Sequence, residues 1–254
     1  MERWILLRGL VREQRHWGSF PATLAAALPD AQLYTPDLPG NGSRYREASP
    51  SSVRQMVEAC RLQLQQAGIA PPYSLLALSL GGMVALTWAQ LYPQELNRCV
   101  LVNTSMRPYS PFYQRLRWHN YGAILRQLLL GGARAQEQLI LRLTSNTGSA
   151  PQRAALAAQW LGYQQEYPVS RRNALRQLWA AARFRAAPDK PALPLLLIAS
   201  AGDRLVDHAC TLRLAQAWQM PVLLHPTAGH DLPLDAGDWL AQQIAGWVAS
   251  AAAP

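Results

Sequence analysis

The sequence predicts an α/β fold in which a mostly parallel sheet of about six strands is flanked by helices and interrupted by an all-helical insertion. Three observations predict it. Short apolar runs without period-two alternation recur along the chain, which is typical of parallel strands buried on both faces. Stretches with helical periodicity separate these runs. Between two of the later runs, residues 107–187 show helical stretches and no clear strand.

The elements follow in order along the chain. The strands are predicted at 4–7, 33–35, 73–78, 98–103, 195–199 and 222–225. The helices between them are predicted at 20–28, 51–66, 82–91, 208–218 and 238–249. The insertion carries further helical stretches at 111–121, 123–130, 133–143, 151–167 and 171–183, and prolines mark its borders. We therefore expect a core of residues 1–106 and 188–254 and a helical cap of residues 107–187.

Composition excludes several classes of function. No apolar stretch is long enough to span a bilayer, and the N-terminal apolar run ends after four residues, too early for a signal peptide. Three scattered cysteines without metal-like spacing favour buried free thiols and a cytoplasmic location. The net charge is +9, but no nucleic-acid-binding motif accompanies it. Nothing in the sequence indicates a metal or an organic cofactor.

A candidate nucleophile stands between a predicted strand and a predicted helix. Ser79 lies in the run Ala77-Leu78-Ser79-Leu80-Gly81. A hydroxyl attacks carbonyl groups efficiently only when it is held exposed beside a base. A sharp strand-to-helix turn exposes it in this way and requires small residues two positions before and after the serine. The pattern therefore predicts a nucleophilic serine, with an ordinary helix-capping serine as the alternative.

The base and the acid are predicted after the last two strands. His230 stands in the polar loop Thr227-Ala228-Gly229-His230-Asp231, whereas His225 lies on the preceding strand and is expected to be structural. Asp203 follows the strand at 195–199, and Asp207 is the alternative acid unless it caps the next helix. The order serine, aspartate, histidine is the one expected for a catalytic triad on this scaffold.

Acyl transfer also requires donors for the oxyanion of the tetrahedral intermediate. The residue after the nucleophile normally supplies one, which predicts the backbone N–H of Leu80. The loop after the first strand should supply the other, and there we expect the N–H of Leu10. Gly9 is expected to keep the backbone thin near the substrate.

These residues resemble those of the α/β-hydrolase superfamily, and the resemblance covers nearly the whole chain. The matching features are Gly9, the turn at 37–43, the Ser79-Leu80-Gly81-Gly82-Met83 run, Asn103, Asp203 and His230. Within the superfamily, the chain most resembles small carboxylesterases of the pimeloyl-carrier-protein methyl-esterase type and, more loosely, menaquinone-pathway enzymes. This implies a serine esterase with a helical cap and a small-molecule ester substrate. Arg8 departs from the pattern, because the family usually has histidine there.

The insertion holds the basic excess of the chain. It contains twelve arginines and only two acids, Glu137 and Glu166, for a net charge of +10. These charges either form a solvated surface or dock an acidic partner such as an acyl carrier protein or an acyl-CoA. Three activities remain open: hydrolysis of an ester or thioester, a lyase or C–C bond hydrolase reaction with the same triad, and ligand binding with little turnover.

Overall fold

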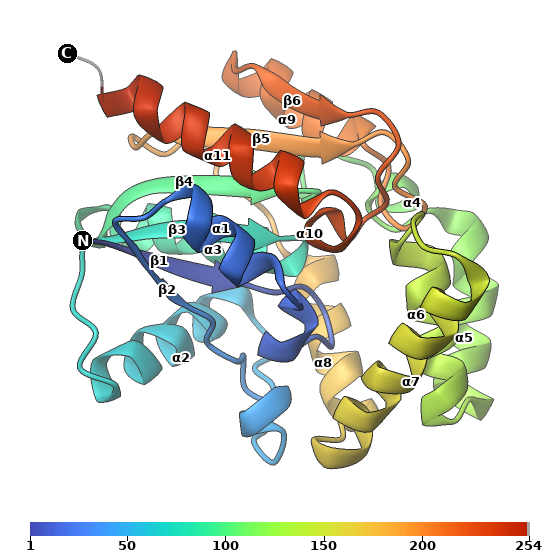
Figure 1. Ribbon diagram of the computed structural model, residues 1–254. Coiled ribbons are helices and arrows are strands. Elements are labelled where there is room, and N and C mark those ends of the chain that lie inside the picture. The colour runs from blue at the N-terminus through green and yellow to red at the C-terminus, as the bar shows by residue number, and fades with distance from the viewer. Residues whose placement is uncertain (253–254) are drawn as a thin grey trace.

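The computed structural model describes residues 1–252 and contains a six-stranded sheet in the order β2-β1-β3-β4-β5-β6 (Figure 1). Every neighbouring pair of strands is parallel. The predicted parallel α/β fold is therefore confirmed. The strands are β1 (Glu2–Leu7), β2 (Ala31–Tyr34), β3 (Tyr73–Leu78), β4 (Leu96–Val102), β5 (Leu195–Ser200) and β6 (Val222–His225).

Helices cover both faces of the sheet. Side chains of the sheet pack with α2, α3 and α9 on one face and with α1, α10 and α11 on the other. In Figure 1, α1 and α11 lie in front of the strands. The bounds are α1 (Phe20–Ala27), α2 (Val53–Gln66), α3 (Leu80–Leu91), α9 (Ala209–Trp218), α10 (Leu232–Asp235) and α11 (Gly237–Ala252).

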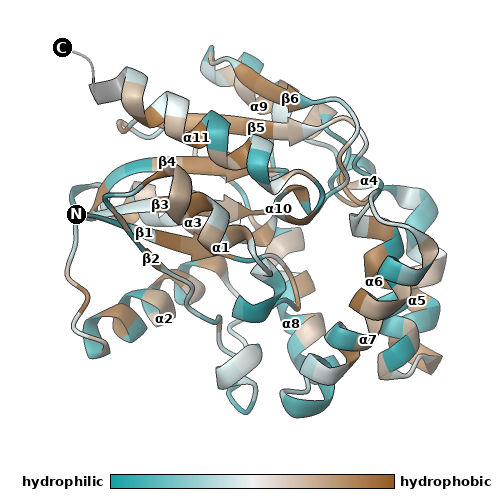
Figure 2. Cartoon of the chain, in the orientation of Figure 1, coloured by the Kyte–Doolittle hydropathy of each residue, from teal (hydrophilic) through white to brown (hydrophobic). Residues whose placement is uncertain are grey.

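Burial on both faces explains why the strand sequences show no polar alternation. Within β3, Leu75 and Ala77 belong to the apolar cluster of one face, whereas Leu76 and Leu78 belong to that of the other. All four side chains are at most 3% exposed. The strands are accordingly among the most hydrophobic parts of the chain (Figure 2). Burying both faces of each strand supplies the main apolar driving force for this fold.

Five helices connect β4 to β5 and lie beyond the carboxyl ends of the strands (Figure 1). They are α4 (Phe112–Arg115), α5 (Tyr121–Leu130), α6 (Ala133–Thr144), α7 (Ala150–Glu166) and α8 (Arg171–Arg183). The two ends of this segment meet, because Arg107 pairs with Arg185 as an isolated parallel bridge and the Ala186 N–H donates to the Arg107 carbonyl at 2.8 Å. We refer to residues 107–187 as the cap.

The first cap helix differs from the sequence prediction. Instead of one helix over 111–121, α4 ends at Arg115 and the chain is extended at Leu116. A long-range contact accounts for the break, because the Arg117 N–H donates to the carbonyl of Leu205 at 2.9 Å. A backbone hydrogen bond to the loop after β5 thus replaces a helical one, and helical periodicity alone does not reveal such a contact.

None of the helices within residues 1–252 combines the length and the apolar character needed to cross a bilayer. Cys60, Cys99 and Cys210 are buried thiols at separate places in the core. Burial raises the pKa of the Cys60 thiol to about 12 and that of the Cys210 thiol to about 11. Both thiols are therefore protonated near neutral pH and are weak nucleophiles.

Candidate active site

Ser79 occupies a strained turn between β3 and α3. Its φ of 58° and ψ of −116° lie outside the common region for a residue with a side chain. The turn is fixed by the Ser79 N–H, which donates to the Val102 carbonyl, and by the Ser79 carbonyl, which accepts from the Gly82 N–H. Gly81 is required by close packing, because a Cβ there would lie 2.4 Å from the carbonyl oxygen of Leu7.

His230 and Asp203 form a buried pair at the ends of neighbouring strands. The Nδ1 atom of His230 lies 2.6 Å from Oδ2 of Asp203, and the two residues are 5% and 3% exposed. The other carboxylate oxygen of Asp203 accepts from the N–H groups of Leu205 and Val206 at 2.8 and 2.9 Å. These donors fix the carboxylate, which in turn orients the imidazole.

The alternatives to these two residues have other contacts. Asp207 accepts from the Ala209 N–H at 3.0 Å at the start of α9, which is the capping arrangement considered from the sequence. His225 accepts from the Ala228 N–H at 3.0 Å, and its ring packs edge-on against Trp239. His225 therefore shapes the turn that leads to His230.

The loop after β1, residues 8–13, approaches the serine from the other side; we call it the β1 loop. A Cβ on Gly9 would lie 3.2 Å from the Ser79 Cβ and 3.7 Å from its Oγ. The absence of a side chain therefore lets the loop backbone lie directly against the serine. Leu80 is the first residue of α3, and N–H groups in the first turn of a helix have no acceptor within the helix. The proposed oxyanion donors Leu10 and Leu80 both line the cavity that Ser79 lines.

That cavity has a volume of about 450 Å³ and lies between the sheet and the cap. Ser79, His230 and the β1 loop line it on the core side. Most of the remaining wall is apolar and comes from α5, α6 and α8, including Ile124, Leu128, Leu139, Ile140 and Leu178. The cavity therefore joins a polar reacting centre to a predominantly apolar pocket, which is the usual character of a small-molecule site.

Arg8 makes the contact that sequence reasoning missed. Its two terminal nitrogens lie 3.0 and 2.6 Å from the two carboxylate oxygens of Asp231, and both side chains are buried. The guanidinium also lies over the Trp17 ring, 4.8 Å from its centroid. Asp231 directly follows His230, so this pair joins the β1 loop to the histidine loop. The only sequence signal for it was arginine at a position where a histidine is usual.

Two further polar residues hold the histidine loop. Asn103, at the end of β4, has a positive φ of 47°, and its side-chain amide donates to the His230 carbonyl at 2.8 Å. Asp235 accepts from the Gly229 N–H at 2.7 Å and from the Asn146 N–H of the cap at 2.8 Å. The position of His230 thus depends on both the sheet and the cap. Within residues 1–252, no group of three or more His, Cys, Asp and Glu side chains is arranged to hold a metal ion.

Comparison with protein families gives a match over nearly the whole chain: residues 4–243 match the profile described as the Alpha/beta hydrolase family. The pimeloyl-[acyl-carrier protein] methyl ester esterase of Xylella fastidiosa (strain M12) is 28% identical over 236 residues, covering 85% of this chain and 84% of that one. A homoserine O-acetyltransferase of Citrifermentans bemidjiense is 39% identical over 71 residues, covering 28% of this chain. This aligned part spans only 19% of the acetyltransferase.

The fold also resembles solved structures. A thermophilic esterase from Thermogutta terrifontis superposes with a TM-score of 0.76 at 18% identity. The superposition covers 98% of this chain and 90% of the esterase. At this identity the likeness bears on the fold, and it extends over the sheet and the cap together.

Proposed function

The chain belongs to the Alpha/beta hydrolase family, and from that premise we propose that it is a serine hydrolase that cleaves a carboxylic ester or thioester. The observation that carries the proposal is the buried Asp203–His230 pair, whose histidine lines the same cavity as a serine held in a strained strand-to-helix turn. A serine, a histidine and an orienting carboxylate in this arrangement are the parts needed to activate a hydroxyl.

The proposed reaction has two halves. Ser79 Oγ attacks the ester carbonyl while Nε2 of His230 accepts the hydroxyl proton, and Asp203 stabilises the resulting imidazolium. The N–H groups of Leu10 and Leu80 donate to the oxyanion. The tetrahedral intermediate collapses as His230 returns the proton to the departing alcohol or thiol, leaving an acyl-serine. A water molecule, deprotonated by His230, then attacks the acyl-serine and releases the carboxylic acid and the free serine.

The cavity supports an apolar acyl group. Burying each methylene of an acyl chain contributes about 0.8 kcal/mol. Three arginines line the wall. Arg8 and Arg12 are each paired with a buried carboxylate. The terminal nitrogens of Arg115 donate to the backbone carbonyls of Ala181 and Ala182. Most of the other side chains in the wall are apolar. A neutral, largely aliphatic acyl group is therefore the best match for this wall.

The outer surface of the cap supports an acidic carrier for that acyl group. Of the twelve cap arginines, only Arg117 lies within 4.0 Å of a carboxylate in the described part of the chain, and its partner is Asp207. Uncompensated positive charge above an acyl pocket is complementary to an acyl carrier protein or to the phosphates of an acyl-CoA. The Xylella relative is named as an esterase of an acyl-carrier-protein ester, which supports this choice.

The test is hydrolysis of p-nitrophenyl acetate and butyrate by the wild-type chain and by Ser79→Ala. Removing the nucleophile of a triad lowers kcat by about 10⁶-fold, so turnover by the variant should be undetectable. Ser105→Ala is the matched control, because Ser105 is a second serine in the cavity wall and should be dispensable. A fluorophosphonate should label the wild type and Ser105→Ala but not Ser79→Ala. A wild-type chain with neither turnover nor labelling would contradict the proposal.

A further inference from the structure

The β1 loop is anchored by a buried arginine on each side of Leu10. Arg8 lies two residues before Leu10 and Arg12 two residues after it, and they are 5% and 7% exposed. Arg8 pairs with Asp231 of the core, whereas Arg12 pairs with Glu137 of α6 in the cap. One anchor therefore joins the loop to the histidine, and the other joins it to the cap.

The Arg12–Glu137 contact is almost completely enclosed. Arg12 Nη1 lies 2.8 Å from Glu137 Oε2, and the Glu137 side chain is 1% exposed. The guanidinium lies 4.6 Å from the Trp160 ring centroid in α7. Among the described residues, Arg12 Nη2 and both Glu137 oxygens make no hydrogen bond of regular geometry, so the contact is an ion pair. Removing either charge would leave the other buried and uncompensated, so the pair resists separation strongly.

The backbone between Leu10 and Arg12 is strained. Val11 has a φ of +52°, and a β-branched residue rarely adopts this left-handed conformation. Such a conformation persists only where surrounding contacts impose it. Two contacts hold this turn: the Arg12 N–H donates to the Gly9 carbonyl at 3.4 Å, and the Val11 N–H donates to Oε1 of Gln177 in α8 of the cap at 2.8 Å.

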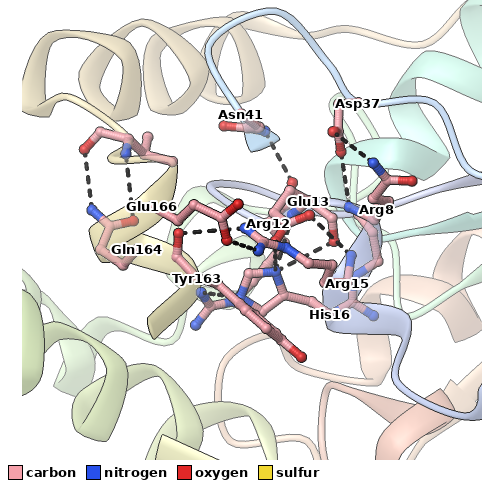
Figure 3. Close-up of polar contacts among 12 residues, drawn as sticks. Arg8, Arg12, Glu13, Arg15, His16, Asp37, Asn41, Tyr163, Gln164 and Glu166 are labelled. Atoms are coloured by element: carbon pink, nitrogen blue, oxygen red, sulfur yellow. Dashed lines mark hydrogen bonds and ion pairs between the residues drawn. The ribbon is translucent and has the colours of Figure 1, made fainter. Parts of the chain in front are cut away.

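Gln177 also fixes the next peptide unit of the loop. Its Nε2 donates to Oδ1 of Asn41 at 2.8 Å. In turn, Nδ2 of Asn41 donates to the carbonyl of Arg12 at 3.1 Å, as Figure 3 shows. Gln177 and Asn41 are both fully buried. The N–H of Val11 and the carbonyl of Arg12 are thus held by one chain of hydrogen bonds that begins on a cap helix.

We propose that Glu137 and Gln177 are positioning residues through which the cap holds the β1 loop in its strained, catalytically competent shape. The oxyanion site is then complete only when the cap is seated on the loop. This inference rests on the proposed function, because it takes the Leu10 N–H as an oxyanion donor. It gives the cap a part in the chemical step in addition to enclosing the acyl group.

The chain provides a matched control. Glu166 is the other acid of the cap, and it pairs with Arg15, which lies just beyond the β1 loop (Figure 3). The Glu166 side chain is 56% exposed, and Arg15 keeps a second carboxylate partner in Glu13 at 2.6 Å. Exposed ion pairs contribute little to structure, so Glu166→Gln removes one cap charge without disturbing the loop.

The experiment compares Glu137→Gln and Gln177→Leu with Glu166→Gln on p-nitrophenyl butyrate. Removing an oxyanion donor outright lowers kcat by about 10²–10³-fold, so displacing one should lower it by about 10–100-fold. KM should stay within about twofold, because the acyl pocket is unchanged. Glu166→Gln should keep wild-type values of both constants.

The affinity for two inhibitors distinguishes a displaced oxyanion donor from a general disturbance of the site. A trifluoromethyl ketone forms a tetrahedral adduct with the serine and uses the oxyanion donors, whereas the matching methyl ketone occupies the pocket without a stable adduct. Glu137→Gln and Gln177→Leu should weaken the trifluoromethyl ketone by about the factor lost in kcat and leave the methyl ketone unchanged.

A double variant tests whether the lower kcat of the single variants is caused only by a loss of stability. Arg12→Met/Glu137→Met replaces the buried pair by apolar side chains, an exchange that commonly preserves stability. We expect a Tm near that of the wild type and a kcat that stays low. Recovery of kcat together with Tm would overturn the inference, as would wild-type kcat in both single cap variants. Absence of Ser79-dependent turnover in the wild-type chain would instead overturn the proposed function, and this inference with it.

Discussion

The core and the cap are stabilised in different ways. In the core, side chains on both faces of β3 are buried and belong to two extended apolar clusters. In the cap, the buried cluster is small, with Leu141, Ala157 and Trp160 as its members, and the outer face of α5 exposes several leucines. Figure 2 shows the mixed character of the cap helices. Apolar burial therefore holds the core together, whereas the cap adds directed polar contacts to the apolar packing of Ala180 and Ala186 against the core cluster.

The arginines of the two regions also differ in whether they have carboxylate partners. The buried arginines of the β1 loop, Arg8 and Arg12, have carboxylate partners, and the partner of Arg12 is Glu137 of the cap. Most cap arginines, in contrast, have no carboxylate within 4.0 Å in residues 1–252. Glu137 thus joins the cap to the core, and most of the positive charge of the cap has no carboxylate partner among the described residues. In the proposed function, that charge is available to attract an acidic carrier.

The largest effect should appear in the salt dependence of hydrolysis. Raising ionic strength from about 0.01 M to about 0.15 M shortens the Debye length from about 30 Å to about 8 Å. If the cap docks an acidic carrier, kcat/KM for an acyl-carrier-protein ester should fall by about 10-fold or more. The value for p-nitrophenyl butyrate should stay nearly constant, because that ester is neutral.

Charge-removing variants localise this effect. Arg126→Gln and Arg134→Gln, at exposed positions of the cap, should lower kcat/KM for the carrier-linked ester and flatten its salt dependence. Arg54→Gln, at an exposed position of α2 in the core, is the control and should have no effect. Equal responses of the cap and core variants would show that total charge, and not the cap, attracts the carrier.

A second comparison uses one glycine from each region. A Cβ on Gly81 of α3 would lie 2.4 Å from the Leu7 carbonyl oxygen, which belongs to the sheet and cannot move aside. Gly162 of α7 has no atom within 4 Å of the corresponding position. Gly81→Ala should therefore destabilise the protein by about 1–3 kcal/mol through overpacking. Gly162→Ala should stabilise it by about 0.5–1 kcal/mol, because alanine favours helix.

Urea unfolding of both variants measures these changes. Gly81→Ala should also lower esterase activity, because the same turn presents Ser79. A Gly81→Ala variant with wild-type stability would mean that the contact between α3 and β1 is looser than the structure indicates. Both glycines lie in helices, so alanine gains helix propensity at each position. The opposite signs of the two stability changes therefore come from the difference in packing.

Local sequence patterns predicted much of the fold. The order of strands and helices follows from apolar runs and helical periodicity, and each strand has its own signal within a few residues. Ser79, Asp203 and His230 could be singled out because each follows a strand in a recognisable local context. The carboxyl ends of parallel strands meet at one edge of the sheet, so separate local signals converge there.

The remaining features depend on contacts between distant parts of the chain. Arg8 and Asp231 are separated by 223 positions, and no periodicity relates them. Val11, which has a positive φ, donates its N–H to Gln177, which lies 166 positions later. The break after α4 likewise follows from a hydrogen bond to Leu205. Sequence patterns report which face of an element is buried, but not which polar group will meet it.

The smallest expected effect concerns the boundary between core and cap. His16 is 7% exposed, and its ring packs edge-on against Trp160 and Tyr163 of α7. Burial, together with the nearby charges of Arg12 and Arg8, holds the pKa of His16 well below its usual value. Arg12 Nη1 lies 3.1 Å from His16 Nε2 and donates to it, so protonating that nitrogen would remove the contact. The folded chain therefore keeps this imidazole neutral.

The sign of the pH dependence follows from proton uptake. Below about pH 6.5 the unfolded chain binds a proton at His16 that the folded chain does not, so the free energy of unfolding falls as pH falls toward the folded pKa. One such proton contributes a slope of at most about 1.4 kcal/mol per pH unit. Between about pH 7 and pH 5, His16→Gln should therefore show a shallower loss of stability than the wild type in urea unfolding.

Burial raises the pKa of the Glu13 carboxyl. The folded chain therefore binds this proton more readily than the unfolded chain does, and the contribution of Glu13 to the free energy of unfolding rises as pH falls. Glu13 is present in both the wild type and His16→Gln, so its contribution largely cancels from the difference between their slopes. His119→Gln, at an exposed position of the cap, is the matched control for loss of one histidine. Equal slopes for His16→Gln and the wild type would show that water reaches the His16 ring, which requires the cap to stand away from the β1 loop in solution. In that case the polar contacts that join the two regions could not act on Ser79 chemistry, whereas the expected difference in slope would place α7 firmly against the core.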